Sequence, residues 1–343
     1  MSSTAPARTA AISSRSSYLD ILNDAWAQHL APRAVDAPTV ISTFAGCGGS
    51  SLGYSMAGFR ELLAVEWDQN AVDTFRLNFP DVPVYHGDIA KLSVDECLTR
   101  TGLQPEQLDV FDGSPPCQGF STAGKRMIDD PRNQLFREYV RLLRGLRPKV
   151  FVMENVSGMV KGKMKLIFAD ILRELKASGY AVSARLMNAM YFNVPQSRER
   201  MIFIGVREDL GVAPSHPRGN ARPVVAGQAF QGLSPSDIDE LTPLYLEYWK
   251  KAKPGDAMGK SFGDWKMNPN RAGNVIRKKV SCLAHWAEPR WLALNEFATI
   301  ASFPPSYRWI DKQSAVQRIG NSVPPLFMRS IAQHIRGAIL DTL

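Results

Sequence analysis

The segment from Val40 to Gly53 has the sequence VISTFAGCGGSSLG and is the most informative about the fold. Its first five residues are apolar or β-branched, which predicts a buried strand, and the glycines after them predict a tight turn that opens a helix. Glycines in such a turn let a ligand approach the backbone at the helix N-terminus. The turn alone is a weak signal, because a purely structural turn has the same composition.

A second strand is predicted over 62–65, and it ends at Glu66, Trp67 and Asp68. An acid about twenty residues after a glycine-rich turn commonly accepts hydrogen bonds from ribose hydroxyls, and an indole can stack on a purine. The structural alternative is that Asp68 caps the amphipathic helix predicted over 69–79 while Trp67 packs in the core. The turn and the acid together favour a nucleoside ligand.

A third strand, over 82–85, is followed by Asp88 and Ile89, where a carboxylate could accept a hydrogen bond from an adenine amino group. Strands that alternate with helical segments in this way predict a parallel sheet. In such sheets ligands bind outside the carboxyl ends of the strands.

Cys117 follows a fourth apolar strand, predicted over 108–111, in a loop that contains two consecutive prolines. This is where a reactive thiol is expected in an open α/β sheet. The alternative is a structural cysteine in the core, since free cysteines are among the most buried residues. The flanking prolines and the Gln-Gly that follows suit core packing poorly, so a reactive role is favoured.

Polar residues also adjoin the later strands. Glu154 and Asn155 follow a nearly continuous apolar strand predicted over 149–153, so burial is expected to raise the pKa of Glu154 and suit it to proton donation. A helix-capping acid is the alternative. Arg198 and Arg200 alternate in an extended segment between strands predicted over 180–186 and 201–206, so both should point the same way, toward a phosphate or a carbonyl.

The chain divides into four parts by its patterns. A tail and an accessory helix occupy 1–38, a regular strand-helix alternation occupies 39–210, and a Pro- and Gly-rich part without that alternation occupies 211–288. A return segment, with a helix over 289–303 and a C-terminal helix that reaches residue 343, occupies 289–343. Between residues 250 and 290 there are ten Lys or Arg and only three Asp or Glu, and the aromatic residues Phe262, Trp265 and Trp286 lie among them. This composition favours contact with phosphates and stacking on bases over the alternative of a solvated basic loop.

Bulk composition limits the class of protein. The net charge of +8 favours a polyanionic partner such as nucleic acid, although solvated lysines alone would give the same balance. The four cysteines are too scattered for a disulfide framework or a zinc knuckle, which indicates a reducing compartment. No apolar run is long enough for a membrane span, and residues 1–17 fit a disordered tail better than a secretory or transit signal.

Taken in order, these blocks resemble the DNA cytosine-5 methyltransferase family of the bacterial C5 DNA methylase type. Six blocks carry the resemblance: Phe44 to Gly49, Glu66, Pro116 to Gln118, Glu154 to Val156, Gln196 to Arg200, and Gly320 to Pro324. Together they span roughly 39–210 and 289–343. Any one block is modest evidence, whereas six in order are specific.

The resemblance implies an α/β fold, a doubly wound Rossmann-like sheet of the S-adenosylmethionine-dependent methyltransferases, with a smaller target-recognition domain over 211–288. It implies methyl transfer from S-adenosylmethionine to C5 of a cytosine flipped out of a specific duplex sequence, through a covalent bond between Cys117 and C6, in a restriction-modification or similar defence system. The implied catalytic residues are Cys117, Glu154, Arg198 and Arg200. The implied cofactor-binding residues are Phe44, Gly46, Gly49, Glu66, Trp67, Asp88, Ile89, Leu135, Asn321 and Val323, and the implied substrate-binding residues are Gln118, Ser121, Lys125, Arg126 and Asn155.

Further expectations follow from the resemblance. The protein is expected to bind double-stranded DNA as a monomer and to have a companion restriction endonuclease. It is expected to need no metal, to bind no membrane, and to work in the bacterial cytoplasm at the nucleoid. Two positions depart from the family pattern: Ser42 stands where many members have Asp, and Ala293 where Thr is usual. Neither touches the reacting atoms.

Three other functions would use similar sequence features. An RNA (tRNA) cytosine-5 methyltransferase could use the same scaffold, and a DNA-binding module without turnover could use the same fold, although the presence of Cys117 and Glu154 argues against the module. A dinucleotide oxidoreductase is disfavoured, because Ser51 stands at the last position of the Gly-x-Gly-x-x-Gly pattern.

Overall fold

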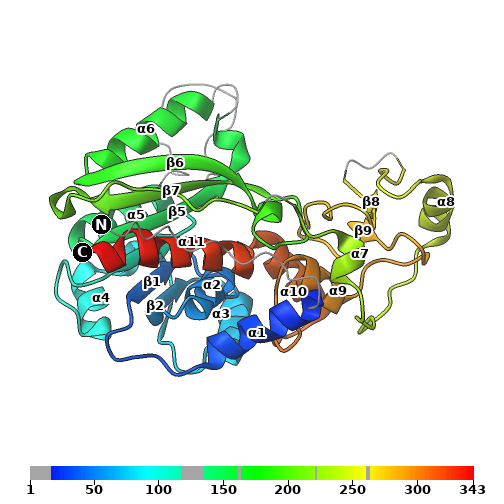
Figure 1. Ribbon diagram of the computed structural model, residues 1–343, viewed down its shortest axis with the longest axis horizontal. Helices are drawn as coiled ribbons and strands as arrows, with labels where there is room; N and C mark the ends of the chain where they lie inside the picture. The colour runs from blue at the N-terminus through cyan, green and yellow to red at the C-terminus, as the bar shows by residue number, and fades with distance from the viewer. Residues whose placement is uncertain (1–16, 117–133, 161–163, 221, 260–262) are drawn as a thin grey trace, which may run out of the picture.

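The computed structural model describes residues 17–116, 134–160, 164–220, 222–259 and 263–343, and its main body is a seven-stranded sheet between two layers of helices (Figure 1). The strands are β1 (Thr39–Thr43), β2 (Arg60–Glu66), β3 (Val84–His86), β4 (Val110–Gly113), β5 (Val150–Val156), β6 (Tyr180–Asn188) and β7 (Glu199–Arg207).

The strand order is β3-β2-β1-β4-β5-β7-β6. All neighbours are parallel except β7, which runs antiparallel to both β5 and β6. The chain moves outward from β1 to β3 and then returns to place β4 on the other side of β1. This reversal creates a topological switch point between the carboxyl ends of β1 and β4, the usual ligand position in such sheets.

Two apolar clusters cover the two faces of the sheet. The first contains Val40 and Val152 from the strands and packs against α2 (Gly49–Met56), α3 (Gln69–Asn78) and α11 (Pro325–Ala338). The second contains Ile41 and Phe151 and packs against α4 (Val94–Thr101), α5 (Gln134–Leu146) and α6 (Met164–Lys176). Adjacent strand residues therefore point to opposite layers, as the pleat requires.

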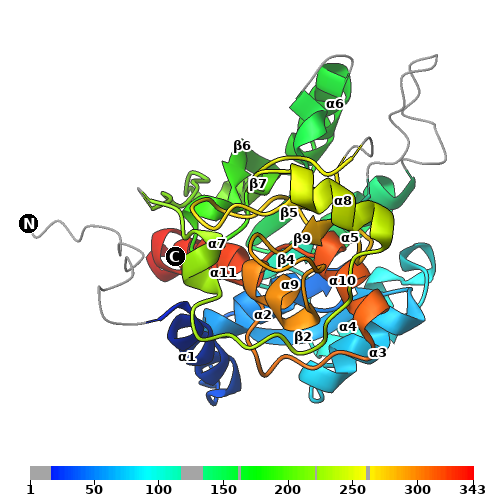
Figure 2. The same ribbon diagram turned by 90° about the vertical axis from the view of Figure 1, so that its right-hand side faces the viewer.

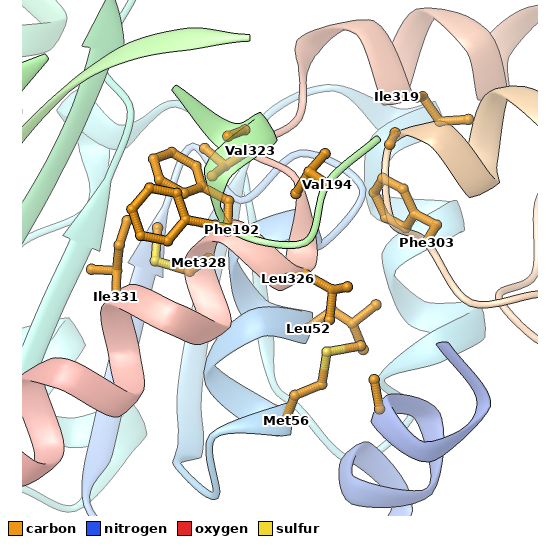
Figure 3. Packing of buried hydrophobic residues seen from close by; sticks show 14 of the residues in the cluster. Leu52, Met56, Phe192, Val194, Phe303, Ile319, Val323, Leu326, Met328 and Ile331 are labelled. Carbon is orange, nitrogen blue, oxygen red and sulfur yellow. The ribbon is translucent and has the colours of Figure 1, made fainter. Parts of the chain in front are cut away.

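The accessory helix α1 (Tyr18–Leu30) is capped by Ser17, whose side chain accepts a hydrogen bond from the Asp20 amide at 3.2 Å. It packs against α2 on the outside of the first layer. Next to it, α2 and α11 lie in close contact, and Figure 3 shows Leu52 and Met56 of α2 beside Leu326. Gly53 makes this approach close, because a Cβ there would lie 2.6 Å from Cβ of Met328.

The part over 211–288 contains α7 (Ala226–Ala229), α8 (Pro243–Lys251) and the short parallel pair β8 (Trp265–Lys266) and β9 (Leu283–Ala284). Figure 1 shows it beyond one end of the sheet, and in Figure 2 it lies in front of the sheet. Its Leu241 and Met258 form a small apolar cluster with Trp291 of the return segment, while Met267 and Leu283 join the first cluster of the main body.

The structure corrects several element boundaries. β5 continues through Glu154 and Asn155, so both lie within the strand instead of after it. β7 begins at Glu199 and includes Arg200. The helix predicted over 289–303 is limited to α9 (Leu294–Ile300), and α11 ends at Ala338, before the chain end. Four helices, α4, α7, α8 and α10 (Lys312–Asn321), were not predicted.

Candidate active site at the carboxyl end of the sheet

The glycine-rich turn between β1 and α2 lies at the switch point. Phe44 and Gly46 have φ values of 56° and 58°, and a positive φ at a non-glycine residue such as Phe44 is uncommon and tends to cluster at functional sites. A Cβ at Gly46 would meet no atom within 4 Å, whereas a Cβ at Gly48 would lie 2.5 Å from the Phe79 ring. Gly46 therefore faces open space, whereas Gly48 packs against the Phe79 ring.

Glu66, the last residue of β2, holds this turn in place. Its Oε2 accepts a hydrogen bond from the Gly46 amide at 2.8 Å, and its Oε1 accepts from the amides of Trp67 and Asp68, each at 2.9 Å. Asp68 also caps α3 by accepting from the Ala71 amide at 3.0 Å. Trp67 is 76% exposed, so the alternative in which it packs in the core does not hold.

Three further predicted cofactor residues surround the same end of the sheet. Asp88 is exposed and caps the short 3₁₀ turn η1 (Ile89–Lys91), accepting from the Ala90 amide at 3.0 Å. Ile89 is buried in the second apolar cluster, and the half-buried Leu135 of α5 and Phe44 pack against that cluster. The apolar residues thus come together, with the Asp88 carboxylate at their edge.

The return segment contacts the glycine-rich turn and the end of β2. Arg318 of α10 forms a salt bridge with Asp68 at 3.0 Å, and the Cys47 thiol lies 3.1 Å from Oγ of Ser322. The Tyr307 hydroxyl donates a hydrogen bond to the Cys47 carbonyl. A Cβ at Gly49 would lie 2.4 Å from the carbonyl oxygen of Val323, so only glycine fits there.

Asn321 is the last residue of α10 and is exposed, whereas Val323 is buried. An open glycine turn, an exposed indole and a nearby carboxylate fit the adenosyl part of a nucleoside cofactor. Sequence reasoning missed the contributions of Arg318, Ser322 and Tyr307, because no local pattern links residues more than 200 positions apart.

Glu154 and two arginines form the second part of the site. Arg200 Nε lies 2.5 Å from Oε1 of Glu154, and both side chains are largely buried. Arg198 is 2% exposed, and its Nη2 donates to the Gly320 carbonyl at 3.1 Å. Burial, together with the charge of Arg200, lowers the pKa of Arg198 to about 9, so the guanidinium stays protonated at neutral pH.

The two arginines therefore differ in their surroundings: Arg200 pairs with Glu154, while Arg198 is enclosed and contacts the return segment. That both arginines point the same way, toward a phosphate or a carbonyl, stays a prediction. The Glu154 ion pair was not foreseen, since the argument from the strand end considered burial alone.

The strand that leads to Cys117 ends beside Glu154. β4 and β5 are parallel neighbours, and Nδ2 of the buried Asn155 donates to the Pro115 carbonyl at 3.2 Å. The predicted site residues Cys117, Gln118, Ser121, Lys125 and Arg126 lie outside the described residues. The other three cysteines, Cys47, Cys97 and Cys282, are buried, and burial raises the pKa of each thiol to about 11.

Comparison with known proteins decides the family. The family model described as C-5 cytosine-specific DNA methylase matches residues 38–231 and 224–337. The chain belongs to this family. It is a DNA (cytosine-5-)-methyltransferase that uses S-adenosylmethionine.

Individual relatives agree with this assignment. The chain is 35% identical over 324 residues to Type II methyltransferase M1.HphI of Haemophilus parahaemolyticus, covering 87% of this chain and 86% of the relative. It is 38% identical over 360 residues to Type II methyltransferase M.NgoPII of Neisseria gonorrhoeae, covering 92% and 99%. These relatives support the DNA methyltransferase prediction over the RNA alternative.

Solved structures confirm the predicted fold class. A putative DNA modification methyltransferase encoded within a prophage of E. coli matches with a TM-score of 0.77 and 25% identity, over 89% of this chain and 100% of that chain. The DNMT2 mutant structure from Spodoptera frugiperda shares the fold, with a TM-score of 0.65 and 19% identity over 88% and 99%.

The two positions where this methyltransferase departs from the family pattern both lie inside the fold. Ser42 is fully buried on β1, and Ala293 is fully buried just before α9. The Ala293 amide donates to Glu296 at 2.8 Å, and Glu296 pairs with Arg290 at 2.7 Å. Glu296 thus satisfies the start of α9 without a hydroxyl at position 293.

Two predicted base-stacking residues of the methyltransferase are engaged within the protein. Trp286 stacks on His285 and Phe230, with ring centroids 4.2 and 5.4 Å apart. Trp265 packs, half-buried, against the first apolar cluster. Both therefore have a structural role, while Phe262 lies outside the described residues.

No group of three His, Cys, Asp or Glu side chains lies close enough to hold a metal ion in the described part of the chain. No helix among the described segments is both long enough and apolar enough to cross a membrane.

Proposed function

We propose that the enzyme methylates a cytosine flipped out of a specific duplex DNA sequence through a transient bond between Cys117 Sγ and C6, as the modification enzyme of a restriction-modification or similar defence system. The observation that carries the proposal is the junction of β4 and β5. Asn155 contacts Pro115, two residues before Cys117, while its neighbour Glu154 pairs with Arg200. The Type II methyltransferase names of the relatives support the defence role.

The thiol starts the reaction. C5 of cytosine is a poor nucleophile, and adding a thiolate to C6 forms an S–C6 bond while the C5=C6 electron pair moves toward C5 and the N3–C4 system. Glu154 hydrogen-bonds or protonates N3 as negative charge develops there, and Arg200 and Arg198 hold the carboxylate and the base carbonyl. When bound, S-adenosylmethionine supplies the electrophilic methyl group.

The end of the reaction restores the enzyme. Once C5 has bonded to the methyl carbon and the cofactor sulfur has left as a neutral thioether, a base removes the C5 proton. The electron pair of the C5–H bond re-forms the C5=C6 bond, the S–C6 bond breaks to release the thiolate, and a proton given to N3 returns to Glu154. Water is our candidate for that base, since no residue is assigned to it. A free thiol is only a few per cent ionised at neutral pH, so Cys117 requires activation by its loop, by nearby arginines and by the cationic cofactor.

The target base is inaccessible inside a duplex and must be extruded, at a cost of a few kcal/mol. In this proposal Gln118, Ser121, Lys125 and Arg126 bind the flipped base. Residues 211–288 select the sequence, and their basic composition supports this role. The enzyme acts as a monomer on double-stranded DNA at the bacterial nucleoid in the cytoplasm, with a companion restriction endonuclease and without a metal.

Bisulfite sequencing of DNA from cells that express the parent or the Cys117→Ser variant tests this function. The parent should protect cytosines in one sequence context, and the variant should protect none. Equal protection by the variant would reject nucleophilic catalysis by Cys117. Labelled methyl transfer in vitro, with duplex DNA and tRNA as competing acceptors, distinguishes DNA from RNA as the substrate.

A further inference from the structure

Three segments that are distant in the sequence meet beside the arginines. They are 195–198, which precedes β7; 273–277, from the proposed target-recognition region; and the end of α10 at Gly320. The contacts between them are mainly through the backbone, so they do not depend on flexible side chains.

The first contact is a strand-like pairing. The Gly273 amide donates to the Pro195 carbonyl at 2.8 Å, and the Ser197 amide donates to the Gly273 carbonyl at 2.8 Å. Gln196 and Gly273 form a parallel bridge. Two backbone hydrogen bonds therefore join the recognition region to the segment that leads into Arg198 and Arg200.

The second contact connects the same region to the cofactor side. A Cβ at Gly320 would lie 2.7 Å from the Arg277 carbonyl oxygen, so residue 277 packs directly on the α10 backbone. The Gly320 carbonyl in turn accepts the hydrogen bond from Arg198. Gly320 is thus in contact with both of the other segments, one position before Asn321.

The junction is enclosed but contains polar atoms that could respond to a ligand. Gln196 is 1% exposed, and neither its Oε1 nor Arg198 Nε has a hydrogen-bond partner among the described residues. Arg277, the last residue of segment 273–277, and Lys278, which follows it, are exposed cations. The guanidinium of Arg277 lies against Gly263, where a Cβ would be 1.9 Å from Cζ.

We propose that segment 273–277 is a positioning element that sets Arg198, Arg200 and the end of α10 in their catalytic places when the region binds its own DNA sequence. The inference rests on the proposed function of 211–288 as the recognition region. Its consequence is that sequence discrimination appears in kcat as well as in binding. A small displacement of a positioned group can lower a rate by about 100-fold, so backbone pairing is sufficient to produce such an effect.

The test compares Gly273→Pro with Gly273→Ala. Proline removes the amide that donates to Pro195, whereas alanine keeps it. An added Cβ would lie 3.0 Å from the flexible end of Met267 and 3.3 Å from the Pro195 carbonyl, so alanine needs only a small adjustment. The substrates are a duplex with the sequence mapped by bisulfite sequencing and a duplex with one base pair changed outside the target cytosine.

We expect Gly273→Pro to lower kcat on the mapped duplex by about tenfold or more. On the altered duplex kcat should change by less than about twofold. The Kd for DNA should stay nearly unchanged. Gly273→Ala should keep the discrimination of the parent. An equal loss on both duplexes, or a change in Kd alone, would overturn the proposal. A parent without DNA methylation would instead reject the proposed function.

A measurement on the parent covers the case in which Gly273→Pro does not fold. Hydrogen exchange of peptides covering 190–200 and 270–278 is followed with the mapped duplex and with the altered duplex, both in the presence of S-adenosylhomocysteine. We expect greater protection of the Ser197 and Gly273 amides with the mapped duplex only. Identical exchange with both duplexes would contradict the proposal.

Discussion

Arg200 Nε lies 2.5 Å from Oε1 of Glu154, across the antiparallel pair β5 and β7. Glu154 lies opposite Ile202 in this pair, so the ion pair runs diagonally to the residue two positions earlier on β7. Both side chains point to the face that Val150 and Val152 share. The sheet therefore orients the carboxyl group before any substrate binds.

Glu154→Gln should remove the acid while keeping the size of the side chain. We expect kcat to fall by about 100-fold to 10,000-fold with cofactor Kd nearly unchanged, because an acid-base group contributes that range to a rate. Glu199→Gln is the matched control, since Glu199 is the exposed neighbour of Arg200. Single-turnover methyl transfer measures both variants, and a normal rate for Glu154→Gln would contradict the assigned role.

Trp67→Ala tests the cofactor surface. Because Trp67 is largely exposed, its loss should change the free energy of unfolding by less than about 0.5 kcal/mol. Loss of adenine stacking should raise the Kd of S-adenosylmethionine by about tenfold, from calorimetric titration. Val35→Ala, at another exposed apolar side chain, is the control. Unchanged affinity in Trp67→Ala would place the adenine elsewhere.

The Asp68–Arg318 salt bridge should couple the turn to the return segment. Asp68→Asn keeps an acceptor for the α3 cap and removes only the charge, and Arg318→Gln removes the other charge. Each variant should weaken cofactor binding by about threefold to tenfold, and the double variant should be no weaker than the poorer single variant. Additive losses in the titrations would show that the two side chains act independently.

Thiol labelling should separate Cys117 from the other cysteines. With pKa values raised to about 11 by burial, Cys47, Cys97 and Cys282 are ionised in about one molecule in 10,000 at pH 7. Iodoacetamide should therefore label the folded protein at Cys117 alone, as read by peptide mass spectrometry. Labelling in denaturant is the control that all four thiols can react. Equal labelling of Cys47 in the folded protein would contradict the packing of the turn.

Two helical glycines should respond to alanine with opposite signs. Gly53→Ala places a Cβ 2.6 to 2.7 Å from the α11 backbone and Met328, so it should destabilise the fold by about 1–3 kcal/mol. Gly337→Ala, on α11, meets nothing within 4 Å and should stabilise by about 0.5–1 kcal/mol. Urea denaturation measures both, and a stable Gly53→Ala would show that α2 and α11 can separate at little cost.

The sequence predicted the parts of the fold that depend on local patterns. Apolar runs located the strands of the main sheet, and glycines located the turn after β1. Short elements such as α4 were missed because an eight-residue helix has little periodicity. The continuation of β5 through Glu154 was also missed, since a polar residue at a strand end is locally indistinguishable from the first residue of a loop.

Strand, turn and helix preferences act over a few residues, so the order of amino acids is enough to identify the chemical groups of the enzyme and the order in which they occur. Which of these groups come into contact depends on how the whole chain folds. Glu154 pairs with Arg200, Arg318 with Asp68, and Gly273 with Ser197 because the sheet order and the return segment bring them together. The physical reason is that burial and hydrogen bonding reward contacts without regard to sequence separation, so the partners leave no local trace in the chain.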